Sequence, residues 1–310
     1  MLTIYKSVEG GLDQMDAVVP GCWINLVDPT AEEIEQVMAL GVPQDFITYP
    51  LDIDERSRTE REDDGKLLVL LRIPYFHGAK ADIPYNTIPL GIIMADQYLV
   101  TVCRRENEVL GEIASGRLKG ISTAKRNRFI LRTLLQTASK YLSYLREINK
   151  IVDALEDQLQ LSMRNNEVME LLKYQKSLVY FTTALKSNEL MMERLQRSQL
   201  FRMYPDDEDL LEDVLTENQQ AIEMVNISNN ILSSMMDAFA SIISNNLNVV
   251  MKFLASVTIV MSIPSVITGF FGMNVNLPIA DHPYAYVMII GVSLLASVGV
   301  VAIFQKRHWF

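Results

Sequence analysis

Residues 253–274 read FLASVTIVMSIPSVITGFFGMN and decide the architecture of the chain. No side chain from Phe253 to Met273 is charged, which gives 21 residues where a membrane-spanning helix needs about 20. A second uncharged run of 21 residues extends from Tyr284 to Phe304. Only the ten residues 274–283 separate the two runs, so we predict a hairpin of two transmembrane helices.

Small or polar residues recur on the first span at a spacing of three or four. This polar stripe consists of Asn248, Met251, Ala255, Thr258, Ser262, Ser265 and Gly269, of which only Met251 is neither small nor polar. The spacing puts the stripe on one helix face, and most other positions are bulky and apolar. One interpretation is close helix packing through small residues. The alternative is a face that avoids lipid, which Asn248 before the span and Asn274 beyond it favour.

The first span ends in Gly272, Met273 and Asn274, and a basic tail follows the second span. This stretch resembles the CorA family of magnesium transporters, whose signature is Gly-Met-Asn in this place. The resemblance covers residues 248–274 at family spacing and the closing Lys306 to Trp309. Residues 23–37, WINLVDPTAEEIEQV, are also similar to the family's N-terminal region.

The resemblance implies a homopentamer whose first spans surround a common axis. Gly272, Met273 and Asn274 would form the selectivity filter, and Asn274 would bind hydrated Mg²⁺ through its water shell. The polar stripe would line the pore, with Met251 and Leu254 as an apolar constriction near the cytoplasmic side. Mg²⁺ is then both the transported and the regulatory ion, without an organic cofactor. The implied partners are further copies of the chain, the lipid bilayer and divalent cations.

Two departures from the family pattern concern the affinity of the predicted pore for cations. Phe271 stands where the family usually has Tyr, and the loop that usually carries glutamates has Asn276 and only one acid, Asp281. We therefore expect a lower affinity for cations at the mouth of the pore. Relatives that move zinc vary the middle residue of the motif, whereas Met273 is retained here. Mg²⁺ is preferred on this ground, and Co²⁺, Ni²⁺ and Zn²⁺ stay as alternatives.

The resemblance also implies closure by cytosolic Mg²⁺. Counted back from Asn248 without a gap, Asp213 falls where the family places an aspartate in a regulatory metal site between subunits. Its partner on the neighbouring subunit is open. The candidates are Asp82 and the acids of the charged run 52–65, namely Glu60, Glu62, Asp63 and Asp64. A solvated connection is the alternative interpretation of that run.

Composition narrows the function classes. The net charge is −10, which excludes a general nucleic-acid binder. Cys22 and Cys103 give no disulfide framework or zinc spacing, and the first 20 residues lack a secretory signal. Lys252 lies before the first span, and Lys306 and Arg307 lie after the second. These basic residues predict an integral protein of the inner membrane whose two termini lie in the cytoplasm.

The domain organisation follows from periodicity. We predict a cytosolic α/β domain over 1–124, with strands at 67–74, 88–94 and 98–103 and a helix capped by Thr30 and Glu33. A helical hairpin over 125–206 follows, with helices at 125–162 and 166–200. A stalk helix then continues into the first span over 207–274. An extracellular loop (275–283), the second span (284–304) and a basic cytosolic tail (305–310) complete the chain.

The stalk helix carries a heptad-like apolar seam. Its members are Leu211, Leu215, Asn218, Ile222, Val225, Asn229, Leu232, Met236, Phe239, Ile243, Leu247 and Val250. One interpretation is packing against the preceding helices of the same chain. The other, suggested by Asn218 and Asn229, is that part of the seam faces water.

Two other function classes explain the sequence less well. An enzyme has no support, because the chain has no Walker loop, HExxH motif or nucleophile elbow, and His77, His282 and His308 are scattered. A membrane-anchored scaffold or sensor would need only the stalk. That alternative leaves the polar stripe and Asn274 unexplained.

Overall fold

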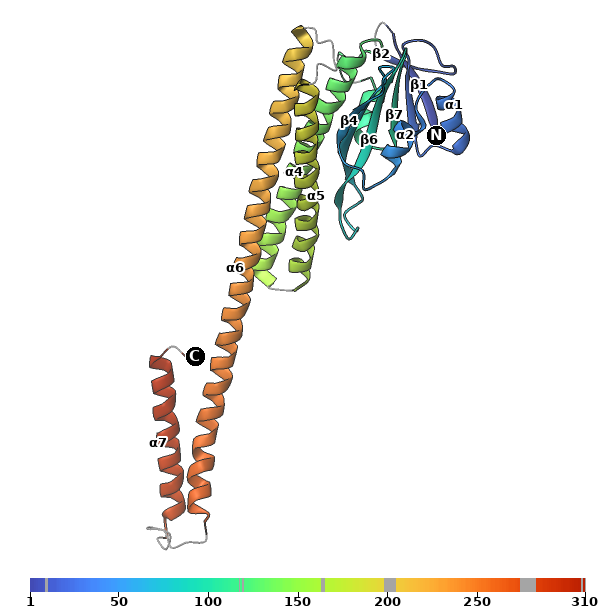
Figure 1. Cartoon of the computed structure of the whole chain (residues 1–310). Helices are drawn as coiled ribbons and strands as arrows, with labels where there is room; N and C mark the ends of the chain where they lie inside the picture. The colour runs from blue at the N-terminus through green and yellow to red at the C-terminus, as the bar shows by residue number, and fades with distance from the viewer. Residues whose placement is uncertain are drawn as a thin grey trace. The chain divides into compact units, whose positions relative to one another are not determined.

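A computed structural model describes residues 1–310 except 9, 10, 117, 119, 163, 164, 198–204, 274–282, 308 and 310. Side chains at 160–162, 165, 166, 205 and 206 are also left out of the description. The chain divides into two compact units, Met1–Met235 and Met236–Phe310. The helix α6, Pro205–Phe271, contributes to both units (Figure 1).

The first unit is built on a seven-stranded sheet of order β2-β1-β3-β7-β6-β5-β4. Its strands are β1 Leu2–Val8, β2 Gly11–Met15, β3 Trp23–Val27, β4 Arg58–Arg61, β5 Leu67–Phe76, β6 Tyr85–Ala95 and β7 Tyr98–Cys103. Only the central pair β3 and β7 is parallel among these strands. The strands predicted at 67–74, 88–94 and 98–103 are confirmed within β5, β6 and β7.

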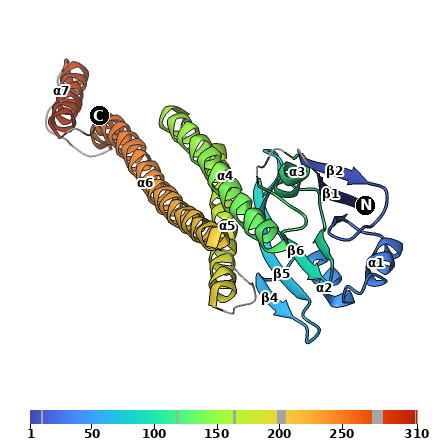
Figure 2. The same cartoon turned by 90° about the horizontal axis from the view of Figure 1, so that it is seen from above.

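Both faces of the sheet are covered, which explains the continuous apolar runs of the central strands. Leu67, Val69 and Leu71 of β5 face the helices α3 Glu108–Ala114, α4 Arg126–Ser162, α5 Asn165–Arg197 and α6. Leu68 and Leu70 face α1 Ala31–Met38 and α2 Gln44–Thr48. Figure 2 shows these two sets of helices on opposite sides of the sheet.

The predicted helix start at Thr30 is confirmed with its capping box. The Thr30 hydroxyl accepts from the Glu33 amide at 3.3 Å, and the Glu33 carboxylate accepts from the Thr30 amide at 3.0 Å. The long helices predicted at 125–162 and 166–200 correspond to α4 and α5. Pro264 lies inside α6 without ending it.

The first part of α6 packs against α4 and α5 of the same chain. Leu211, Val225 and Leu232 of the seam are buried. Asn218 is only 2% exposed, and its Nδ2 donates to the Leu185 carbonyl of α5 at 3.5 Å. Asn229 Nδ2 donates to Thr182 Oγ1 of α5 at 3.3 Å. At these two asparagines the structure bears out the interpretation of packing within the same chain, because the α5 backbone and a hydroxyl accept their amide protons.

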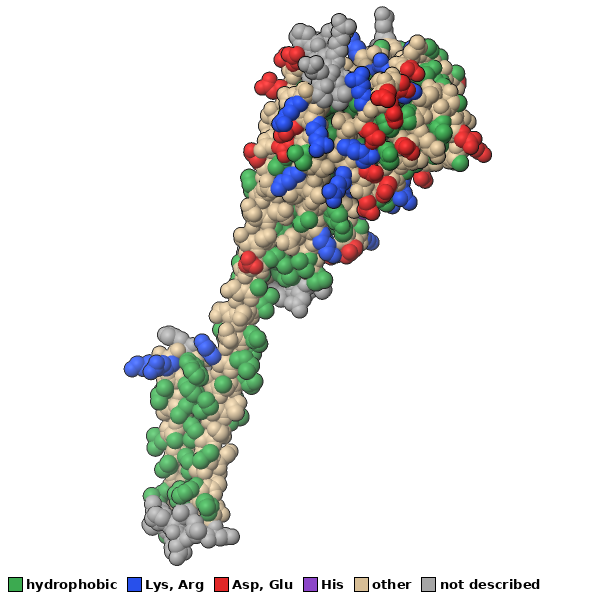
Figure 3. Space-filling view, in the orientation of Figure 1, with side chains coloured by type: hydrophobic (Ala, Val, Ile, Leu, Met, Phe, Trp, Pro, Cys, Tyr) green, Lys and Arg blue, Asp and Glu red, His purple; other side chains and the backbone are tan. Residues whose placement is uncertain are grey.

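The second unit contains the end of α6 and the helix α7, Ala285–Lys306. Both helices are long and apolar enough to cross a bilayer by length and composition. The basic residues of this unit are Lys252, Lys306 and Arg307. Figure 3 shows Lys and Arg side chains at one end of this unit and hydrophobic side chains below them.

Candidate functional site

The polar stripe lies on an open face of α6. All seven members, Asn248, Met251, Ala255, Thr258, Ser262, Ser265 and Gly269, are exposed, and Leu254 is exposed with them. The covered positions of the same helix lie between them: Ser256 is fully buried, and Val260, Ile263, Pro264 and Ile267 are partly covered. The stripe and the covered positions therefore occupy different faces of one helix.

The helix α7 covers the second face. It is the other described element of this unit. Its covered positions are Ala285, Ile289, Gly291, Ser293, Ala296, Ser297, Val300, Val301 and Phe304, and apart from Gly291 they share one helix face. Ser293 is 5% exposed and Ser256 is 0% exposed. Small residues of this kind let two helix backbones approach closely. Ser256 and Ser293 thus belong to the covered faces of α6 and α7, and the polar stripe does not.

The hydroxyl groups of the stripe donate their protons to the backbone of α6. Thr258 Oγ1 donates to the Leu254 carbonyl at 2.8 Å, and Ser262 Oγ donates to the Ile259 carbonyl at 2.8 Å. Ser265 Oγ reaches the Met261 carbonyl at 3.5 Å. A hydroxyl whose proton is used in this way presents its oxygen lone pairs to the surroundings. This face of α6 therefore offers hydrogen-bond acceptors.

The predicted filter begins where α6 ends. The Gly272 amide donates to the Thr268 carbonyl at 2.9 Å, and the Met273 amide donates to the Phe270 carbonyl at 3.3 Å. A Cβ at position 272 would lie 3.3 Å from the Thr268 carbonyl oxygen, so glycine fits this tight turn best. Asn274, the third residue of the predicted filter, lies outside the described residues.

Three of the six acids that the sequence proposes as regulatory ligands already have basic partners. Glu60 lies 3.3 Å from Arg58, Asp64 pairs with Lys66, and Asp82 lies 3.8 Å from Lys176. Asp213 is exposed on α6. Within the described part of the chain, no three His, Cys, Asp or Glu side chains lie close enough to hold a metal ion.

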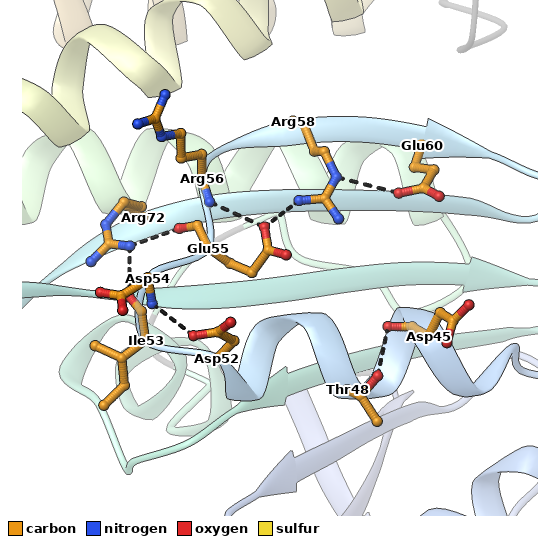
Figure 4. Close-up of polar contacts among 10 residues, drawn as sticks. All are labelled: Asp45, Thr48, Asp52, Ile53, Asp54, Glu55, Arg56, Arg58, Glu60 and Arg72. Atoms are coloured by element: carbon orange, nitrogen blue, oxygen red, sulfur yellow. Dashed lines mark hydrogen bonds and ion pairs between the residues drawn. The ribbon is translucent and has the colours of Figure 1, made fainter.

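The acids at the start of the charged run 52–65 were not among the candidate ligands. Asp52, Asp54 and Glu55 lie between the 3₁₀ turn η1, Tyr49–Leu51, and β4. Arg72 of β5 donates to the Ile53 and Glu55 carbonyls and so fixes the course of this loop (Figure 4). Asp52 accepts from the Asp54 amide at 3.0 Å, and both carboxylates are exposed. The run of charges drew attention to this segment of the sequence. Arg72 lies too far along the sequence to be assigned as its partner.

These features define a class of protein: a two-span membrane protein with an α/β domain, a long helix and an acceptor-lined face in its first span. The CorA-like Mg²⁺ transporter protein family matches residues 21–307, and the chain belongs to this family. The family membership that the motif predicted is thus confirmed.

Two relatives and one solved structure are similar over nearly the whole chain. The cobalt/magnesium transport protein CorA of Methanocaldococcus jannaschii is 29% identical over 299 residues, covering 93% of this chain and 90% of the relative. The protein of the same name from Thermotoga maritima is 27% identical, covering 97% and 87%. The complete structure of the CorA magnesium transporter from Methanocaldococcus jannaschii superposes with a TM-score of 0.86 at 24% identity, covering 100% and 99%. The last likeness confirms the predicted fold.

Proposed function

We propose that this chain is one subunit of a homopentameric channel that moves hydrated Mg²⁺ across the cell membrane. The observation that carries the proposal is the open polar stripe of α6, which faces away from α7. Two spans cannot enclose a pore, so several copies must bring their stripes together around an axis. The names of the curated relatives, which are magnesium and cobalt transport proteins, support the same ion class.

The chemistry of the stripe suits a cation that keeps its water. Mg²⁺ dehydrates reluctantly, so a pathway that accepts hydrogen bonds from its bound waters costs less than one that replaces them. Thr258, Ser262 and Ser265 present hydroxyl oxygens for this purpose. Asn274 and the Gly272 carbonyl would bind the hydrated ion at the mouth, and Met251 with Leu254 would form the apolar constriction.

The domain boundaries and the orientation are part of the same proposal. Residues 1–124 and 125–206 would form the cytosolic part, 207–274 the stalk and pore helix, and 275–283 the outside loop. Lys252 before the first span and Lys306 with Arg307 after the second support an inner-membrane protein whose two termini lie in the cytoplasm.

Closure by cytosolic Mg²⁺ would use Asp213 of one subunit and acids of its neighbour. Among the candidates that the sequence proposes, Glu62 and Asp63 are better partners than Glu60, Asp64 or Asp82, because the latter three already pair with basic side chains. Carboxylates from two subunits repel each other until a divalent cation lies between them. Mg²⁺ would hold the subunits together, and its loss would release them.

Growth of a strain starved of Mg²⁺ tests the transport function. The wild-type chain should restore growth and pass Mg²⁺ into liposomes, whereas Asn274→Ala should do neither, because the ring of amide oxygens at the mouth is lost. Asn230→Ala is the matched control, since Asn230 is an exposed asparagine on the first part of α6. Absence of flux with any divalent cation would favour the scaffold alternative. Flux of Co²⁺, Ni²⁺ or Zn²⁺ without flux of Mg²⁺ would show that one of these ions, and not Mg²⁺, is the transported cation.

A further inference from the structure

The parallel strands β3 and β7 end side by side at the same end of the sheet. Val27, the last residue of β3, lies opposite Cys103, the last residue of β7. The Asp28 amide donates to the Cys103 carbonyl at 2.9 Å. Asp28 and Arg104 are therefore the first residues beyond the paired strands, and the chain leaves the sheet at these two neighbouring points.

From these two points the chain continues to opposite faces of the sheet. After β3 it forms α1, which packs in the core of Leu68 and Leu70, and after β7 it forms α3, which packs in the core of Leu67 and Val69 (Figure 2). Where neighbouring parallel strands diverge in this way, an opening is left at their carboxyl ends, and open α/β sheets bind their ligands there. The topology thus indicates a ligand site beyond the ends of β3 and β7.

A crevice of about 520 Å³ lies at this place. Its lining includes Val27 and Asp28 at the end of β3, Tyr75 of β5, and Arg104, Arg105 and Glu106 after β7. Its volume is within the range of small-molecule sites, roughly 300–1,000 Å³. The crevice is therefore large enough for a ligand of the size of a nucleotide.

Four charged side chains line the crevice without neutralising one another. Arg104 and Arg105 are exposed, and within the described part of the chain neither guanidinium forms an ion pair. Asp28 and Glu106 are also exposed and form no ion pair with a described residue. Both signs of charge thus remain available to a ligand.

The ring of Tyr75 holds one of the two guanidinium groups in place. The Arg105 guanidinium lies over this ring, 5.6 Å from its centroid, and His77 packs edge-on against the ring at 4.8 Å between centroids. Burial, and after it the charge of Arg105, lowers the pKa of His77, so the imidazole is neutral near neutral pH. The Met1 amine also lines the crevice, but it pairs with Glu33 at 2.9 Å. The positive charge open to a ligand is therefore that of the guanidinium groups.

The mixture of charges selects the kind of ligand. Guanidinium groups bind phosphate through paired N–H donors. Carboxylates repel a free phosphate, but Mg²⁺ is usually held by one or two carboxylates together with the phosphates of a ligand. A phosphate that carries Mg²⁺ matches both signs of charge in the crevice, whereas a free phosphate or a free cation is repelled by one of them.

We propose that this crevice binds the diphosphate or triphosphate group of a small soluble molecule as its Mg²⁺ complex. Arg104 and Arg105 bind the phosphate oxygens, and Asp28 and Glu106 face the metal ion. Nucleotides and inorganic diphosphate share this group. The site uses residues of the first unit only, so the inference does not depend on the proposed transport function.

Binding of ATP to the full-length protein in detergent tests the proposal, measured by isothermal titration calorimetry with the same Mg²⁺ concentration in both solutions. Arg104→Met and Arg105→Met should each raise the Kd about tenfold, because each loses a charge-assisted hydrogen bond. Arg146→Met is the matched control, since Arg146 is exposed on α4 and does not line the crevice. It should bind ATP with the wild-type Kd.

Asp28→Asn tests the role of the metal ion. Asp28 has a φ of 44°, which asparagine also adopts readily, so the change removes the carboxylate charge and keeps the backbone. The variant should bind the Mg²⁺ complex of ATP about threefold to tenfold more weakly. It should bind ATP in EDTA at least as tightly as the wild type does. Wild-type affinity for both forms would overturn the role assigned to Mg²⁺.

Pyrophosphate and adenosine identify the group that is recognised. If pyrophosphate with Mg²⁺ binds as tightly as ATP, the diphosphate group suffices, and if ATP binds more tightly, the ligand is a nucleotide. Either result supports the proposal. Adenosine binding as tight as that of ATP would overturn it, because the phosphates would then contribute nothing. Absence of binding of both ATP and pyrophosphate to the wild type would overturn it as well, and so would wild-type Kd values in both arginine variants.

Discussion

At the scale of single residues, the placement of hydroxyl protons decides what the polar stripe can bind. Serine and threonine in a helix commonly donate to a backbone carbonyl one turn earlier. Thr258, Ser262 and Ser265 follow this pattern. Their oxygens remain available as acceptors, which suits the outward-pointing protons of water bound to a cation.

Thr258→Val tests this role with little change in shape. The variant removes one acceptor per subunit, and a hydrogen bond contributes about 0.5–1.5 kcal/mol. We expect Mg²⁺ flux to fall about twofold to tenfold, as measured in liposomes at low Mg²⁺. Thr258→Ser should retain flux. Ser297→Ala is the control, because Ser297 donates to Ser293 on α7, away from the stripe; an equal loss there would argue against a pore role for Thr258.

Residue-level prediction succeeded where the chemistry is local. Thr30 and Glu33 are three residues apart, and their capping box could be predicted from the sequence. The hydrogen bond from the Arg72 amide to Asn188 Oδ1 could not be predicted, because the two residues are 116 positions apart and each has many alternative partners. For the same reason the sequence leaves two interpretations of Asn218 and Asn229 open, and the structure shows that α5 accepts their amide protons.

At the scale of elements, α6 has two faces with different neighbours in the second unit. The face of Ser256 is covered and the face of Ser262 is open. The sequence pattern alone identified the polar stripe, but it could not say which small residues contact α7. The short strand β4 was also missed, since its residues Arg58–Arg61 are charged and polar.

Two substitutions of serine by leucine on α6 separate these faces. Ser256→Leu should overpack the contact with α7 and lower the free energy of unfolding by about 1–3 kcal/mol, measured as thermal stability in detergent. Ser262→Leu should leave thermal stability near that of the wild type and abolish Mg²⁺ flux, because an apolar ring would enter the pathway. The opposite pattern would show that the stripe, and not Ser256, faces a helix.

At the scale of the whole molecule, the first unit has a core of its own and the second does not bury its apolar surface. Only 6% of the apolar window of each spanning helix is buried within the chain. Lipid and further copies of the chain would cover the rest. The family and the fold could be predicted from the motif and its place. The number of subunits stays a prediction from the resemblance.

Asp213→Ala tests regulation between subunits. Loss of this carboxylate should weaken the bridging cation and raise the Mg²⁺ concentration for half closure about tenfold, measured by flux in liposomes. Glu212→Ala is the matched control, because Glu212 is the preceding residue, is exposed and carries the same charge. If both variants behave alike, a general effect of charge explains the shift and Asp213 has no specific role.

The hydroxyl groups of α6 that donate their protons to the helix backbone also affect how anions would meet this face. From Thr258 to Gly269, each hydroxyl of the open face is already engaged with a backbone carbonyl, so chloride would meet oxygen lone pairs and no free donor. In the proposed pore, walls made of such helices would disfavour anions without a fixed negative charge. Selection of cations over anions would then follow from the hydrogen bonds between the hydroxyl groups and the backbone of α6. It would persist at any pH at which the protein stays folded.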